Sequence, residues 1–178
     1  VIGNNPESSE VFTPESYSSA LKIKDSHIAV ATSDNGLYLG SFDSATGEVE
    51  INQSNPVGNY DGTVYTAEFS PSGNNLFFGS YTASYLMAVE VNNPTVLKTF
   101  TSISLPRRLQ IGIDNKIYLT TGSSLNHLSV LSTPDNILNP GFVLNTLFVG
   151  SFSALLEYGL PQLVPIQPWN GPCINIRK

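Results

Sequence analysis

Three stretches of the chain repeat one layout, and this repetition restricts the fold more than any other feature of the sequence. Each stretch carries an apolar strand pattern, a polar turn, a second apolar strand pattern, a turn of small residues and a third strand pattern. When the layouts are superimposed, Ile23, Phe69 and Ile111 share one position and fall 46 and 42 residues apart. A repeat of roughly 40–50 residues with this layout is typical of β-propeller blades.

Within each repeat, apolar and polar residues alternate with a period near two, which is the pattern of a strand with one buried face. The first two strands of each repeat are separated by residues rich in Pro, Gly, Asn and Asp, which favour tight hairpin turns. These turns are expected at residues 24–26, 70–75 and 114–115, and the third strands at residues 37–39, 85–89 and 127–131.

The repeat predicts an all-β chain of about three to four four-stranded antiparallel propeller blades. Residues 141–160 are expected to supply part of a further blade, because residues 142–144 and 146–149 look extended. Complete propellers have roughly four to eight blades, so the predicted propeller is partial. Either upstream residues or a partner would then cover its unmatched edges. A β-sandwich is the alternative, since it also gives short strands at regular spacing, but the repeat favours the propeller.

The composition excludes several classes of protein. Hydrophobic residues make up 40% of the chain and charged residues 12%, which argues against disorder. The formal net charge is −6, and Lys and Arg form no patch, so nucleic-acid binding is not expected. No stretch approaches the roughly 20 apolar residues that span a bilayer, so no membrane-spanning segment is expected.

Three phrases of the sequence resemble blade signatures of known propellers. Residues 66–81, TAEFSPSGNNLFFGSY, resemble the EFSPDGxxLYVSSY signature of WD40-like and YVTN-type propellers. Residues 109–119, LQIGIDNKIYL, are similar to LQxGPDGKIYVA, and residues 158–164, YGLPQLV, to YGLPNFV. In this order the phrases resemble large secreted Bacteroidetes proteins that carry a propeller before modules exported by the type 9 secretion system. The chain departs from the pattern at Ser72, where Asp is usual, and at Ile113, where Pro is usual.

The resemblance implies a division of the chain and a location. Residues 18–164 would form the blades, and residues 1–17 would continue from a missing upstream blade. Residues 165–178, which include Cys173, would be a linker or the start of a following module. Cys173 is the single cysteine, so no disulfide forms within the chain. The resemblance implies a secreted or cell-surface protein.

The sequence offers no set of catalytic residues, metal ligands or cofactor-binding motifs. It lacks a Gly-x-Ser-x-Gly nucleophile turn, a phosphate-binding Gly-rich loop and a calcium loop. His27 and His127 would share a metal with Asp34 or Asp114 only if both faced a central channel, and ordinary turn and strand histidines are commoner. Glu48 and Glu50 share one face of a possible strand in a solvated setting, so a surface strand is the better interpretation than a glycosidase pair.

Aromatic residues near predicted turns and strand ends are the best sign of a binding surface, because their rings stack on sugars or anchor protein partners. The candidate binding residues are Tyr38, Tyr60, Tyr81, Tyr85 and Trp169.

The sequence therefore favours a non-enzymatic binding or scaffold module that mediates protein or glycan interaction in adhesion or assembly. Its expected partner is a protein, a glycan or the missing remainder of the same polypeptide. Two alternatives stay open. One is a propeller enzyme of lactonase-like or glycan-processing type, with active residues lining the central channel. The other is a structural component of a virion or filament.

Overall fold

The computed structural model describes residues 18–33, 36–51, 56–60, 62–80, 85–101, 103, 106–122 and 124–149. These residues form three four-stranded antiparallel sheets, which are named blades 1, 2 and 3 in chain order. Blade 1 contains β1 (Ser18–Lys24), β2 (His27–Thr32), β3 (Leu37–Phe42) and β4 (Val49–Ile51). Blade 2 contains β5 (Thr66–Phe69), β6 (Asn75–Gly79), β7 (Leu86–Glu90) and β8 (Asn93–Phe100). Blade 3 contains β9 (Pro106–Ile111), β10 (Ile117–Thr121), β11 (Ser124–Leu131) and β12 (Phe142–Phe148).

Each blade is a meander in which strands adjacent in sequence are adjacent in the sheet. This confirms the predicted all-β fold of four-stranded blades. A single turn of 3₁₀ helix, η1 (Val57–Asn59), precedes blade 2. Within the described part of the chain, no helix is long and apolar enough to cross a membrane.

The expectation of a further blade starting near residue 141 is wrong for the residues that the structure describes. β12 is extended as predicted, but it pairs with β11 as the outer strand of blade 3, with Phe142 opposite Leu131. The layout read from the sequence contains only three strands per repeat. The fourth strands, β4, β8 and β12, are largely exposed and carry no alternating apolar pattern that would reveal them.

The hairpin turns after the first strand of each blade are equivalent, as the repeat predicts. Asp25, Gly73 and Asn115 occupy these turns with φ angles of 53°, 75° and 60°. Glycine, asparagine and aspartate tolerate this left-handed conformation better than other residues, which explains the turn residues in all three repeats.

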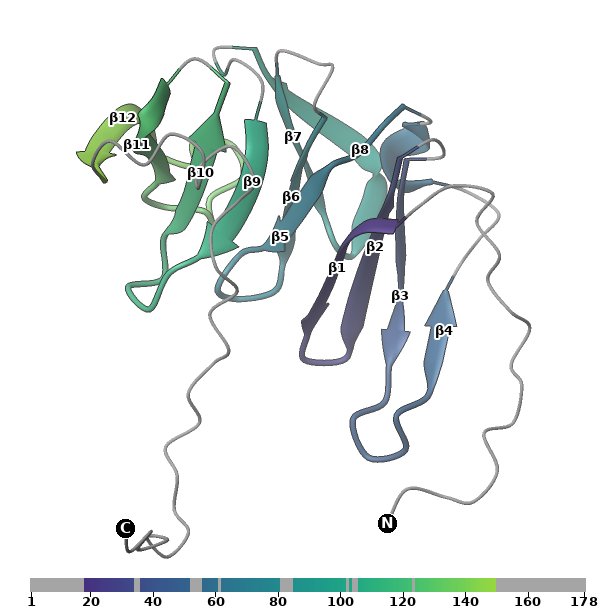
Figure 1. Ribbon diagram of the computed structural model, residues 1–178. Coiled ribbons are helices and arrows are strands. Elements are labelled where there is room, and N and C mark those ends of the chain that lie inside the picture. The colour runs from purple at the N-terminus through teal and green to yellow at the C-terminus, as the bar shows by residue number, and fades with distance from the viewer. Residues whose placement is uncertain are drawn as a thin grey trace, which may run out of the picture.

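The three blades lie side by side with their first strands adjacent (Figure 1). β5 contacts β1 on one side and β9 on the other. Blade 2 is therefore buried on both faces. Phe78 and Met87 belong to the cluster shared with blade 1, whereas Phe77 and Leu86 belong to the cluster shared with blade 3. Phe77 and Phe78 therefore pack on opposite faces of β6.

The boundaries expected at residues 17 and 164 are not tested, because residues 1–17 and 150–178 lie outside the described residues. Cys173 is among them.

Candidate functional site

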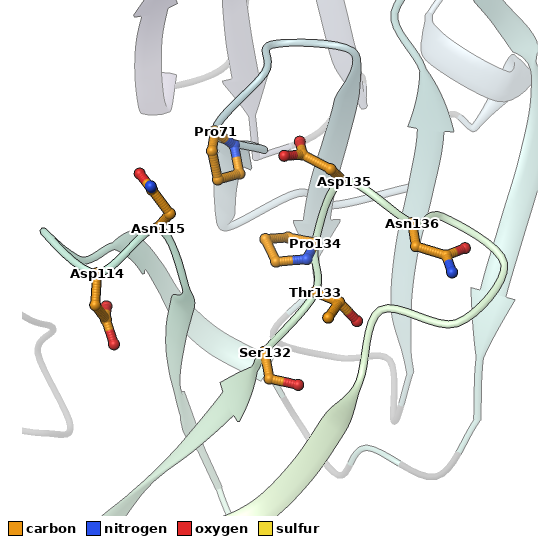
Figure 2. A pocket seen from close by; sticks show the side chains of 8 residues that line it. All are labelled: Pro71, Asp114, Asn115, Ser132, Thr133, Pro134, Asp135 and Asn136. Carbon is orange, nitrogen blue, oxygen red and sulfur yellow. The ribbon is translucent and has the colours of Figure 1, made fainter.

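A pocket of about 500 Å³ opens between blades 2 and 3, where three loops meet (Figure 2). The β5–β6 turn supplies one wall, the β9–β10 turn a second and the β11–β12 loop a third. The half-buried Pro71 gives the pocket apolar surface, whereas Pro134 lies buried in its wall, and short polar side chains surround them. The lining residues are Pro71, Asp114, Asn115, Ser132, Thr133, Pro134, Asp135 and Asn136.

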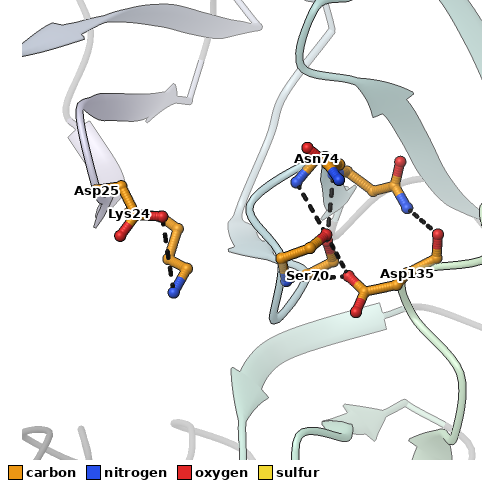
Figure 3. Close-up of polar contacts among 7 residues, drawn as sticks. Lys24, Asp25, Ser70, Asn74 and Asp135 are labelled. Atoms are coloured by element: carbon orange, nitrogen blue, oxygen red, sulfur yellow. Dashed lines mark hydrogen bonds and ion pairs between the residues drawn. The ribbon is translucent and has the colours of Figure 1, made fainter.

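The β5–β6 turn is held by a carboxylate from the neighbouring blade. Asp135 Oδ1 accepts hydrogen bonds from Ser72 N at 3.0 Å and from Ser72 Oγ at 2.6 Å (Figure 3). Ser72 stands where the blade signature that residues 66–81 resemble has Asp, so the turn lacks an acidic side chain of its own. Asp135 provides a carboxylate to this turn from blade 3.

A second link fixes the β11–β12 loop to blade 2. The buried Asn75 side chain donates from Nδ2 to the carbonyl oxygens of Pro134 at 3.0 Å and Asp135 at 2.9 Å. Within the loop, Asn136 Oδ1 accepts from the N–H groups of Leu138 and Asn139, both at 3.2 Å. These contacts hold the loop in one conformation, so the pocket wall is formed before any ligand binds.

The β9–β10 turn carries the second acidic side chain of the pocket. Asp114 Oδ2 lies 2.9 Å from Lys116 Nζ and accepts a hydrogen bond from Tyr118 OH at 2.9 Å. The contact with Lys116 holds the pKa of Asp114 below its usual value, and the same carboxylate raises the pKa of Lys116 and Tyr118. Asn115 follows at the rim, in the left-handed conformation.

Both pocket carboxylates stay ionised at neutral pH. Burial alone would raise the pKa of Asp135, but hydrogen bonds from Ser72 and Ser70 outweigh it and lower the pKa overall. A general acid or base works best with a pKa near the operating pH, and these two groups are shifted away from it. The pocket therefore presents hydrogen-bond acceptors, which suits a ligand rich in hydroxyl or amide donors.

A separate polar cluster joins the first strands of all three blades. Glu68 on β5 is 6% exposed, and its Oε2 lies 2.7 Å from Lys22 Nζ on β1. The same oxygen accepts the backbone N–H of Ile111 on β9 at 3.2 Å. Glu68 is almost fully buried, whereas the pocket carboxylate of Asp135 is exposed, so Glu68 holds the blades together rather than facing a ligand.

Of the candidate aromatic residues, three fall in the described part of the chain, and none of them lines the pocket. Tyr60 and Tyr85 are half-buried and pack against the cluster between blades 1 and 2, with the Tyr60 and Phe78 ring centroids 6.1 Å apart. Tyr38 lies on β3 of blade 1 and is also half-buried. Tyr81 and Trp169 lie outside the described residues.

The other residues considered from the sequence do not converge. His27 lies on β2, whereas His127 lies on β11 and packs against Phe148 with ring centroids 5.2 Å apart. Among the described residues, no three His, Cys, Asp or Glu side chains are grouped as a metal site would require. Asp34 lies outside the described residues, and Glu48 and Glu50 are exposed.

Sequence reasoning missed the pocket because its parts are distant in the chain. The β5–β6 turn and Asp135 are some 60 residues apart and belong to different repeats. The one signal in the sequence was Ser72 in place of the usual turn Asp. Its presence indicates that a carboxylate from elsewhere in the chain can accept the hydrogen bonds of this turn, as Asp135 does.

Comparison with known proteins supports the fold. No family model matches the chain, and no curated protein matches it. Hydrazine synthase of Kuenenia stuttgartiensis matches with a TM-score of 0.52 and 14% identity, over 72% of this chain and 36% of that one. A candidate 6-phosphogluconolactonase from Bacteroides uniformis matches with a TM-score of 0.42 and 18% identity, over 63% of this chain and 37% of that one. The chain thus spans about a third of either protein. At such identities the likeness shows a propeller-type fold alone.

Proposed function

We propose that this chain is a non-enzymatic interaction module of a secreted or cell-surface bacterial protein, and that it binds a glycan in the pocket between blades 2 and 3. The observation that carries the proposal is the pocket itself. It is preformed, it combines the Pro71 ring with a rim of hydrogen-bond acceptors, and its two carboxylates are held in the ionised state. Sugars offer many hydroxyl donors to such acceptors and apolar C–H faces to a proline ring.

Export to the cell surface is supported by the resemblance of residues 66–81, 109–119 and 158–164 to secreted propeller proteins that use the type 9 secretion system. Adhesion or assembly would be the role of such a module. The enzyme alternative gains no support from the pocket, because neither carboxyl group has the raised pKa that proton transfer at neutral pH would need.

An array of immobilised oligosaccharides, probed with the purified chain, tests the proposal. Asn115→Gly removes a rim side chain while keeping a residue suited to the left-handed turn. Asn145→Gly is the matched control, since Asn145 also has a positive φ, of 50°, but lies on β12 outside the pocket. Loss of one hydrogen bond predicts roughly fivefold to tenfold weaker binding for Asn115→Gly only.

Equal affinity of the two variants would show that the ligand does not bind in this pocket. If the chain binds a peptide array and no oligosaccharide, the partner is a protein rather than a glycan. Failure to bind either class would contradict the proposed function as a whole.

A further inference from the structure

The pocket between blades 2 and 3 presents three different chemical groups in a fixed order. The ring of Pro71, which is half-buried, lies between the side chains of Asn115 and Asp135 (Figure 2). Asn115 and Asp135 are exposed and come from two loops of blade 3, whereas Pro71 comes from blade 2. This order of a carboxamide, an apolar ring and a carboxylate restricts the ligand more than hydrogen-bond acceptors alone would.

The carboxylate of Asp135 can only accept hydrogen bonds from a ligand. Burial acts to raise its pKa, but hydrogen bonds from Ser72 and Ser70 hold that pKa below the usual value, so the group is ionised at neutral pH. An ionised carboxyl group has about four acceptor positions and no donor. Ser72 donates two hydrogen bonds to Oδ1 of Asp135, and acceptor positions remain for a donor on the ligand.

The side chain of Asn115 supplies a hydrogen-bond donor on the other side of Pro71. The Asn115 backbone N–H donates to the carbonyl oxygen of Gly112 at 3.1 Å, which fixes the residue in the β9–β10 turn. Its side chain makes no hydrogen bond with another described residue. Because the Nδ2 group carries two N–H donors, an acceptor on the ligand can bind there.

An acetamido group carries the complementary groups in the same order. The amide is planar and trans, and in this form the methyl group lies between the carbonyl oxygen and the N–H along the outer edge of the amide. The oxygen can then accept a hydrogen bond from Asn115, the methyl group can contact the ring of Pro71, and the N–H can donate to Asp135. A hydroxyl group has no apolar part, so it would leave the proline ring without a partner.

We propose that the pocket selects sugars that carry an acetamido group, such as N-acetylhexosamines, with the acetamido methyl against Pro71. This inference rests on the proposed function and names the class of sugar that the same pocket binds. The peptide group of a protein has the same polar atoms, but its chain continues where the acetamido group ends in a methyl. The ring of Pro71 stands at that point, so it favours the group that ends there.

Pairs of sugars that differ only in the acetamido group test the inference. Glucose, galactose, mannose and the β-1,4-linked tetramer of glucose are each compared with the form that carries acetamido groups, by saturation-transfer NMR titration with the purified chain. In at least one pair, the acetamido sugar should bind about tenfold more tightly, because it gains a hydrogen bond and buries a methyl group. Its methyl protons should receive the strongest saturation, since they lie nearest to the protein.

Two variants locate the preference in the pocket. Asn115→Asp keeps the size of the side chain but removes its N–H donors. Pro71→Ala removes the ring from a turn that the Gly73 N–H closes on the Ser70 carbonyl oxygen. Each should reduce the preference for the acetamido sugar by about fivefold. Asn145→Asp is the matched control and should leave the preference unchanged, since Asn145 is exposed on β12 and does not line the pocket.

The ratio of the two affinities within one variant does not depend on the fraction of folded chain, so a destabilised variant still gives a valid comparison. Equal affinity within every pair overturns the inference and leaves the proposed function intact. An unaltered preference in both pocket variants also overturns it, because the acetamido group then binds elsewhere. Binding of an N-acetylated peptide and of no sugar overturns it too, since the partner is then a protein. Failure to bind any of these probes contradicts the proposed function itself.

Discussion

Glu68 is the one charged residue of β5, and the three blades share its carboxylate. Taking a carboxylate out of water is costly unless opposite charge and hydrogen-bond donors compensate. Lys22 and the Ile111 N–H supply that compensation from the blades on either side. The residue therefore links the packing of blade 1 to that of blade 3.

Glu68→Gln keeps the shape of the side chain and an oxygen for the Ile111 N–H, but it leaves Lys22 without its counter-charge. Because the Lys22 side chain is 21% exposed, the expected loss in the free energy of unfolding is moderate, about 1–3 kcal/mol. Urea denaturation of Glu68→Gln, Lys22→Met and the double variant measures it. The double variant should lose less than the sum of the single losses. Strictly additive losses would show that the pair is not coupled.

Asp135 makes the stability of the blade 2–3 contact depend on pH. Its pKa in the folded chain is below the ordinary value of 3.8, so the folded state binds fewer protons than the unfolded state between the two values. The stabilisation is thus complete above about pH 3.8 and is lost as the pH falls through the folded-state pKa.

Asp135→Asn and Ser72→Ala should both lower stability at pH 7 and make it less sensitive to acidification below pH 4. Thermal denaturation between pH 2 and pH 7 measures the effect. If stability depends on acid in both variants as it does in the wild type, the contact between Asp135 and Ser72 does not cause the pH dependence.

At the scale of the element, the central hairpin of blade 2 connects the two apolar clusters. β6 directs Leu76 and Phe78 to one cluster and Phe77 to the other, and β7 alternates in the same way. Since alternate residues of a strand face opposite sides, this one hairpin supplies side chains to both blade contacts.

Phe77→Ala and Phe78→Ala are each expected to lower the free energy of unfolding by about 3–5 kcal/mol, because each leaves a cavity in a fully buried cluster. Val96→Ala, at an exposed site on β8, should change it by less than about 0.5 kcal/mol. Chemical denaturation of the three variants gives the comparison. A small loss for one phenylalanine would show that the cluster on that side of the blade relaxes around the cavity.

The inner strands and their turns could be predicted from the sequence because burial imposes a pattern on them. The residues at the Asp25, Gly73 and Asn115 turns and the pair Phe77-Phe78 carry that pattern plainly. The outer strands could not be placed in their blades, because exposed residues such as those of β12 carry no burial pattern. The pocket depends on Asp135 reaching Ser72 in another repeat, and no local pattern encodes a contact between loops of two blades.

At the scale of the whole molecule, burial is unequal among the blades. Blade 2 is covered on both faces, whereas blades 1 and 3 are each covered on one face by described residues. Local opening of blade 1 or blade 3 therefore exposes less apolar surface than local opening of blade 2.

Hydrogen exchange followed by mass spectrometry should therefore find the slowest amides in β6 and β7 and the fastest in β4 and β12. The exchange rates of β4 and β12 are best compared below the concentration at which any self-association occurs. Equal protection of β12 and β6 under those conditions would show that blade 3 is covered on its second face as well.

The order of the strands also bears on how the chain is made. In the described part of the chain, every strand pairs only with strands of its own blade, and each blade occupies one uninterrupted stretch of sequence. On the ribosome, each sheet can complete its hydrogen bonds as soon as its fourth strand has emerged, because it waits for no later residue. The nascent chain then leaves few backbone groups open to pairing with neighbouring chains while synthesis continues.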